Sequence, residues 1–237
     1  MSEPLRLALV AEGPTDRIVI DAAISRILDE RPFILIQLHP EGSLAFGPLG
    51  GGWGGVYRWC KQAVTRGGLL SNDPLFLAYD LLILHLDADV AKEKYRSANI
   101  HEDLDPGDLP CEEPCPPAQA TTDRLREVLL RWAGEPSTPE RTVLCMPSKS
   151  TEAWVVAALF PTHPAVLDGS HECRSHGQRP LRIRIEKSQP KYENHRTTLS
   201  EAWVTVTEIC TEARRFNDDF RRAVEVVDAI PIATEGS

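Results

Sequence analysis

The sequence has few aromatic residues and lacks any long apolar run. Aromatic residues make up 6% of the 237 residues, and no stretch approaches the ~18 consecutive apolar residues of a membrane span. No basic segment with a following apolar run and cleavage site opens the chain, so we expect no secretory signal, no membrane association and a cytoplasmic protein. The six cysteines are scattered through a mid-sized chain, and we expect them to be reduced thiols.

Basic residues are fewer than acidic residues. The chain has 26 Lys and Arg against 35 Asp and Glu, which gives a formal net charge of -9. This balance argues against a protein that binds nucleic acid through bulk positive charge. It leaves open an enzyme that brings carboxylates and a divalent metal ion to a phosphate.

Apolar runs of strand length alternate with helical patterns along the chain. We predict strands at 5–11, 33–38, 79–86 and 141–146, and helices at 15–28, 56–64, 121–133, 150–160, 199–215 and 216–229. This order predicts an α/β fold with a mainly parallel four-stranded sheet flanked by helices, plus a C-terminal helical extension. We expect a core domain over 1–160, which includes an acidic, proline- and cysteine-containing loop at 99–119. The remainder, 161–237, is predicted to be a basic irregular segment and C-terminal helices packed on the core.

Acidic side chains follow three of the predicted strands. They are Glu12 and Asp16 after the first strand, Asp87 and Asp89 after the third, and Glu152, close to Lys149, after the fourth. The carboxyl ends of parallel strands share one edge of a sheet, where α/β proteins place their chemistry. Carboxylate oxygens are the ligands that Mg²⁺ prefers, and Mn²⁺ accepts them too. The pattern therefore predicts a metal site, with Mg²⁺ or Mn²⁺ as cofactor.

These motifs, in this order, resemble the Toprim domain shared by topoisomerases, primases and OLD-type nucleases. The segment S-K-S-T-E-A-W at 148–154 resembles one in small bacterial Toprim-like proteins of the RloB-like and DUF4276 types, and the helical ending with Cys210, Phe216 and Phe220 is similar to the DUF4276 type. The resemblance covers roughly 5–160. It departs from the family at Val90 and in the long acidic loop, which leaves the number of metal ions open.

The resemblance implies a Rossmann-like core and a Mg²⁺-dependent nuclease, with a role in anti-phage defence and an ATPase partner encoded nearby. It assigns Glu12, Asp87 and Asp89 as catalytic metal ligands and Asp16 as a further ligand. Glu152 would be a ligand or general base, and Lys149 would contact phosphate.

A basic stretch lies within the acidic chain. Between residues 171 and 196 there are seven Lys and Arg against three Glu, a local excess of four positive charges. This makes the stretch the best candidate for contact with a nucleic-acid backbone. The residues we assign to that contact are Arg179, Arg182, Arg184, Lys187 and Lys191.

Other functions remain open from the sequence. The run LLILHLDADV is also similar to the strand of haloacid-dehalogenase-like phosphohydrolases, with Asp87 as nucleophile and Asp89 as acid/base. A non-catalytic Toprim-like module that binds an ATPase or a nucleic acid is a third possibility. A zinc site is open too, from Cys111, Cys115, His171, Cys173 and His176. Trp53, Tyr57 and Trp59 could stack on bases, although such residues more often pack in a core.

Overall fold

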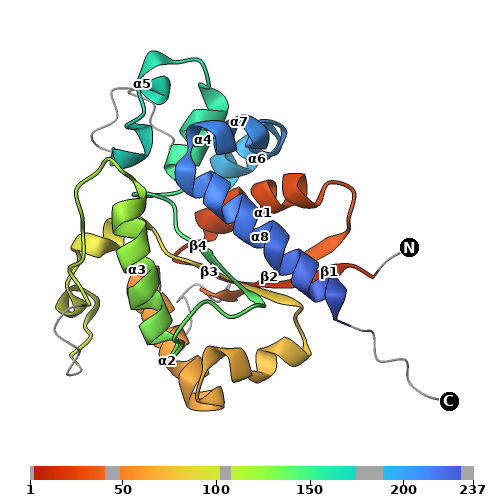
Figure 1. The fold of residues 1–237 in the computed structure, drawn as a ribbon, viewed down its shortest axis with the longest axis vertical. Helices are drawn as coiled ribbons and strands as arrows, with labels where there is room; N and C mark the ends of the chain where they lie inside the picture. Colours follow the sequence, from red (N-terminus) through yellow and green to blue (C-terminus); the bar gives the residue numbers. More distant parts are fainter. Residues whose placement is uncertain (1–2, 41–48, 102–107, 175–188, 231–237) are drawn as a thin grey trace.

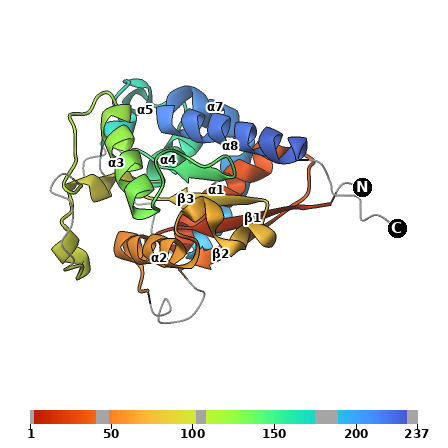
Figure 2. The ribbon, with the colours of Figure 1, turned by 60° about the horizontal axis from the view of Figure 1, so that its bottom comes forward.

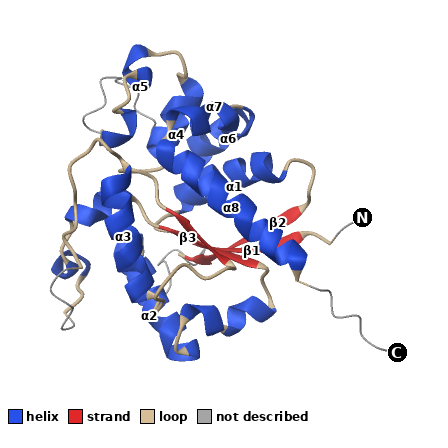
Figure 3. Ribbon diagram, viewed as in Figure 1, coloured by secondary structure: helices blue, strands red, loops and turns tan. Residues whose placement is uncertain are grey.

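The computed structural model describes residues 3–40, 49–101, 108–174 and 189–230, with the side chains of 189–192 left aside. Its strands are β1 (Leu5–Val10), β2 (Phe33–His39), β3 (Leu81–His85) and β4 (Thr142–Cys145). They form one sheet in the order β2-β1-β3-β4, and every neighbouring pair is parallel. The predicted α/β fold with a parallel four-stranded sheet is therefore confirmed. Figure 3 shows the sheet at the centre of the molecule, with helices around it.

Both faces of the sheet are buried over β3, β4 and most of β1, which explains why these strands read as continuous apolar runs, whereas Ile34 and Ile36 of the edge strand β2 are exposed. Along β1, Leu7 and Leu9 face one apolar core, whereas Ala8 and Val10 face another. Two helical layers cover these faces, as the two views in Figures 1 and 2 show. Polar residues therefore collect at the strand ends rather than on the faces.

The first layer joins the N-terminal and C-terminal parts of the chain. It comprises α1 (Pro14–Leu28), α4 (Glu152–Leu159), α6 (Gln189–Glu201), α7 (Trp203–Ile209) and α8 (Thr211–Ala229). At its centre the Trp154 ring packs edge-on against Trp203, with centroids 5.5 Å apart, and is stacked with Phe216 at 6.0 Å. The C-terminal helices thus share a core with α1 and the sheet.

The second layer is formed by α2 (Gly52–Gly67) and α3 (Gln119–Trp132). Trp53 stacks on Trp132 with centroids 6.1 Å apart, and Tyr57 meets Trp132 edge-on at 5.3 Å. Tyr57 and Trp59 are both buried. These rings therefore pack in the core, the role that is commoner for such residues than base stacking.

Short helical segments complete the described chain. They are the 3₁₀ turns η1 (Leu70–Asn72), η2 (Pro74–Leu77), η3 (Ala88–Lys92), η4 (Tyr95–Ala98) and η5 (His171–Cys173), and the short helix α5 (Pro164–Leu167). Within the described residues, no helix has the length and apolar character needed to cross a membrane.

The main differences from the predicted helix boundaries lie in α2 and in the C-terminal helices, where α6 begins at Gln189, ten residues before the predicted start at 199. Helix α2 begins at Gly52, four residues earlier than expected. Gly50 and Gly52 both have left-handed backbones, which glycine adopts without strain, and they form the turn into this helix. The C-terminal helices break at Cys210 rather than at 215–216. Cys210 is buried with an extended backbone, so tertiary packing sets this break and helical periodicity gave no sign of it.

Candidate metal centre

The ends of β1 and β3 bring two of the predicted acidic residues together. The strands are neighbours in the sheet, and Val10 pairs with Leu84 near their carboxyl ends. Beyond these positions the Glu12 Oε1 atom accepts a hydrogen bond from the Asp87 backbone N–H at 2.7 Å. Residues 75 positions apart in the sequence thus meet at one edge of the sheet, as the strand pattern predicted.

Asp16 joins this edge from the first turn of α1. Its Oδ2 atom accepts the Gly13 backbone N–H at 3.0 Å, which caps the start of the helix. Its Oδ1 atom accepts the Thr151 hydroxyl at 2.9 Å. The Thr151 backbone N–H in turn donates to Asp87 Oδ1 at 3.3 Å. Thr151 therefore holds the two carboxylates in fixed positions relative to each other.

Asp16, Asp87 and His85 form a group that could hold a metal ion. One ligand atom from each lies within 4.8 Å of the others, and the group is largely buried. His85 was not among the residues predicted for the site, although a signal was present. His85 and Asp87 are two positions apart at the end of a strand, so their side chains point to the same face. That face is the one covered by α1, which carries Asp16.

The electrostatics of this edge favour a cation. Burial raises the pKa of Glu12 well above its usual range, and the nearby Asp87 and Asp16 carboxylates raise it further, while His85 opposes them. Burial likewise raises the pKa of the Cys145 thiol, which pairs with His85 across β3 and β4. A bound divalent cation would offset the repulsion among these carboxylates.

The other predicted site residues occupy different places. The chain turns into η3 directly after Asp87, so the strand alternation ends before Asp89, whose backbone N–H donates to the Lys149 carbonyl at 3.3 Å. Glu152 is buried at the first position of α4, next to Thr151. Among the described residues, the metal-capable group does not include Glu12, Asp89 or Glu152.

Lys149 is held by the acidic loop rather than open to a ligand. Its Nζ atom lies 2.5 Å from Glu112 Oε1, and its backbone is left-handed with φ of 66°. A phosphate group would have to displace Glu112 to reach this ammonium.

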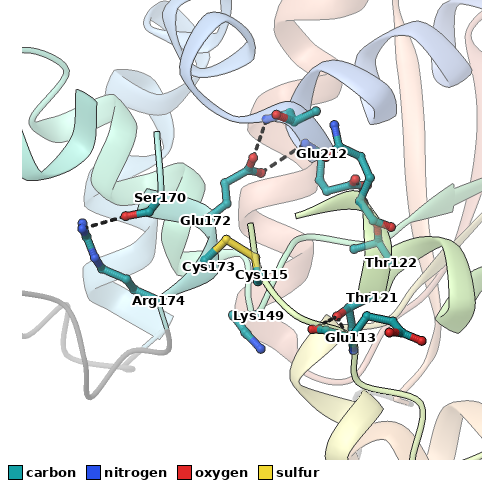
Figure 4. Close-up of a disulfide and its surroundings, with 12 residues drawn as sticks. Glu113, Cys115, Thr121, Thr122, Lys149, Ser170, Glu172, Cys173, Arg174 and Glu212 are labelled. Atoms are coloured by element: carbon teal, nitrogen blue, oxygen red, sulfur yellow. Dashed lines mark hydrogen bonds between the residues drawn. A yellow bond between two sulfur atoms is a disulfide. The ribbon is translucent and has the colours of Figure 1, made fainter. Parts of the chain in front are cut away.

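The expectation of reduced cysteines is wrong for one pair. Cys115 and Cys173 form a disulfide across 58 residues, which links the acidic loop to η5 (Figure 4). Cys60, Cys111, Cys145 and Cys210 are free and buried. Oxidised sulfurs are not the thiolate ligands that zinc needs, so the structure excludes the full zinc set that the sequence left open. His176 of that set lies outside the described residues.

The side chains predicted to contact nucleic acid all lie outside the part of the chain that the structure describes. Arg179, Arg182, Arg184 and Lys187 lie outside the described residues, as do Glu102, Asp103 and Asp105 of the acidic loop. Lys191 belongs to α6, but its side chain is not described.

Comparison with known proteins adds no family to this picture. No family model, no curated protein and no solved structure matches the chain. The Toprim resemblance stays a prediction from the sequence motifs.

Proposed function

We propose that the protein is a divalent-metal-dependent nuclease that hydrolyses phosphodiester bonds at the carboxyl edge of its sheet. The observation that carries the proposal is the meeting of Glu12, Asp16 and Asp87 from β1, α1 and β3 at that edge. The predicted resemblance to Toprim proteins, including those of anti-phage defence, agrees with this reading, and an ATPase partner is part of the same proposal.

The donor set fits a divalent metal ion. Asp16 and Asp87 supply hard oxygen ligands, and Mg²⁺ or Mn²⁺ accepts such ligands together with water and phosphate. A bound ion would polarise the scissile phosphate and lower the pKa of an attacking water.

The protein's own groups orient this site. The hydroxyl and backbone N–H of Thr151 fix Asp16 and Asp87, and Gly13 holds the second oxygen of Asp16. The Glu12 carboxylate accepts a hydrogen bond from the Asp87 backbone N–H, which holds it beside the proposed metal site. From there it can take up a proton from a reacting water. Lys149, once released from Glu112, would stabilise negative charge on the phosphate.

The phosphohydrolase alternative uses fewer of these residues. It gives Asp87 and Asp89 the chemical roles but leaves the Glu12 and Asp16 carboxylates without one. We therefore prefer the nuclease.

The proposal is tested by incubating the protein with plasmid DNA, single-stranded DNA and transfer RNA, each with Mg²⁺ or Mn²⁺. We expect cleavage of at least one substrate that stops on chelation. Asp16→Asn and Asp87→Asn should each reduce the rate at least about tenfold, the smallest loss usual even for outer partners of metal ligands. Asp21→Asn is the matched control, because Asp21 lies on the same helix but pairs with Arg196.

Two results would overturn the proposal. One is cleavage that survives both substitutions at full rate. The other is a folded, metal-loaded protein that cleaves none of the three substrates. Turnover of a small phosphomonoester that depends on Asp87 but not on Glu12 would favour the phosphohydrolase instead.

A further inference from the structure

We propose that His85 is a metal ligand and that it makes the site selective for a first-row transition-metal ion over Mg²⁺. This inference rests on the proposed metal site but not on nuclease activity. It starts from the position of His85, the last residue of β3, whose side chain is fully buried.

A buried imidazole normally makes hydrogen bonds, and among the described residues His85 makes none. Neither ring nitrogen makes a hydrogen bond of acceptable geometry in the described part of the chain. Burying a polar group without such a bond is costly. The side chain is nevertheless fully buried rather than turned to water.

The two nitrogens instead face two carboxylates. Nε2 lies 3.3 Å from Asp87 Oδ1, and Nδ1 lies 3.9 Å from Asp16 Oδ2. A neutral imidazole has one N–H and one lone pair. Whichever nitrogen carries the hydrogen, the other turns its lone pair toward a carboxylate oxygen, so two acceptors oppose each other.

A metal ion resolves this opposition, because it accepts electron pairs from both the imidazole nitrogen and the carboxylate. One ligand atom each from His85, Asp16 and Asp87 lies within 4.8 Å of the others, so a single ion could bind all three side chains. Thr151 already fixes both carboxylates by hydrogen bonds, so the ligand atoms are held before an ion arrives.

The ligand types decide which ion is favoured. Mg²⁺ prefers oxygen ligands alone, whereas imidazole nitrogen suits ions such as Zn²⁺, Fe²⁺ and Ni²⁺. A mixed site of two carboxylates and one imidazole therefore favours a transition-metal ion. Mn²⁺ accepts both ligand types and is paramagnetic, which makes it a suitable probe.

Pulsed electron paramagnetic resonance of the Mn²⁺-loaded protein tests the proposal without any substrate. We expect a ¹⁴N coupling from a directly bound imidazole, replaced by a ¹⁵N coupling when the protein is grown with ¹⁵N-labelled histidine. His85→Asn should abolish this coupling and weaken Mn²⁺ binding at least about tenfold, since outer-shell partners alone cost 10–100-fold. Mg²⁺ binding should change much less.

His39→Asn is the matched control. His39 is also buried at a strand end, on β2. Within the residues that the structure describes, its Nε2 atom also lacks a hydrogen-bond partner, and it does not belong to the metal-capable group. This variant should keep the ¹⁴N coupling. If His85→Asn does not fold, the isotope exchange in the wild-type protein still decides the question.

Bound Mn²⁺ without nitrogen coupling would overturn the proposal, as would equal affinities for Mn²⁺ and Mg²⁺. Absence of any metal binding would overturn it as well, and would indicate an imidazolium that bridges the two carboxylates. If the coupling is present but nothing is cleaved, the nuclease proposal fails while this inference holds.

Discussion

Replacing Cys115 and Cys173 together by serine should lower the free energy of unfolding by about 4 kcal/mol. The disulfide closes a loop of 58 residues that contains α3, β4 and α4. In the chain-entropy account, a cross-link of this span removes about 14 cal/mol/K from the unfolded chain, which is about 4 kcal/mol at 25 °C. With a denaturant slope of about 2 kcal/mol/M, the urea midpoint should fall by about 2 M.

Equilibrium unfolding in urea, followed by circular dichroism and by tryptophan fluorescence, measures this change. The wild-type protein in excess dithiothreitol should match the double variant, because Cys60, Cys111, Cys145 and Cys210 are not cross-linked. Mn²⁺ affinity should stay the same, since α1 and the end of β3 supply the metal-capable group. Equal midpoints for the variant and the oxidised wild type would refute the reasoning, and would mean that the unfolded chain gains no freedom from the loss of the link.

Three further predictions concern pH, packing and metal. Burial raises the pKa of Glu172 to about 7 from an ordinary 4.5, so the stability that its neutral form contributes is full below about 4.5 and is lost as the pH rises through about 7. The free energy of unfolding of the wild type should fall by up to about 3 kcal/mol between pH 4.5 and 8. The urea midpoint of Glu172→Gln should change less over this range, and an equal change in both proteins would contradict the prediction. Gly55→Ala should destabilise the fold by about 1–3 kcal/mol, because the added Cβ would lie 2.4 Å from His39 Nε2. The control Gly13→Ala, whose added Cβ has no neighbour closer than 3.5 Å, should leave the melting temperature unchanged within error. Mn²⁺ at a hundred times its dissociation constant should raise the free energy of unfolding by about 2.7 kcal/mol, and Asp87→Asn should remove most of this gain in a thermal shift assay.

The fold was predictable because its determinants are local in the sequence. Each strand is an apolar run of strand length, and each is followed by a helical pattern, so the parallel sheet follows from topology. The meeting of Glu12 and Asp87 followed from the same reasoning, since both come directly after strands that lie side by side.

The details of the site depend on geometry that the sequence does not carry. Strand periodicity holds through His85 and Asp87 but ends where η3 begins, so the spacing of Asp87 and Asp89 did not indicate that both belong to one group. Thr151 reaches two carboxylates only because β4 delivers it to the edge beside β3.

The disulfide could not be predicted either, for a different reason. Its cysteines lie 58 residues apart and outside the regular strands and α-helices, where no periodic pattern specifies which segments meet. Composition and chain length favoured free thiols, and only the packing of the acidic loop against η5 brings the two sulfurs together.

Anomalous diffraction from crystals soaked in Mn²⁺ and measured at the manganese edge tests the central claim most directly. We predict a peak within bonding distance of Asp16 and Asp87 carboxylate oxygens and of one His85 nitrogen, which is lost in crystals of the Asp87→Asn variant. A site that stays empty at saturating Mn²⁺, with these three side chains in unchanged positions, would contradict the account.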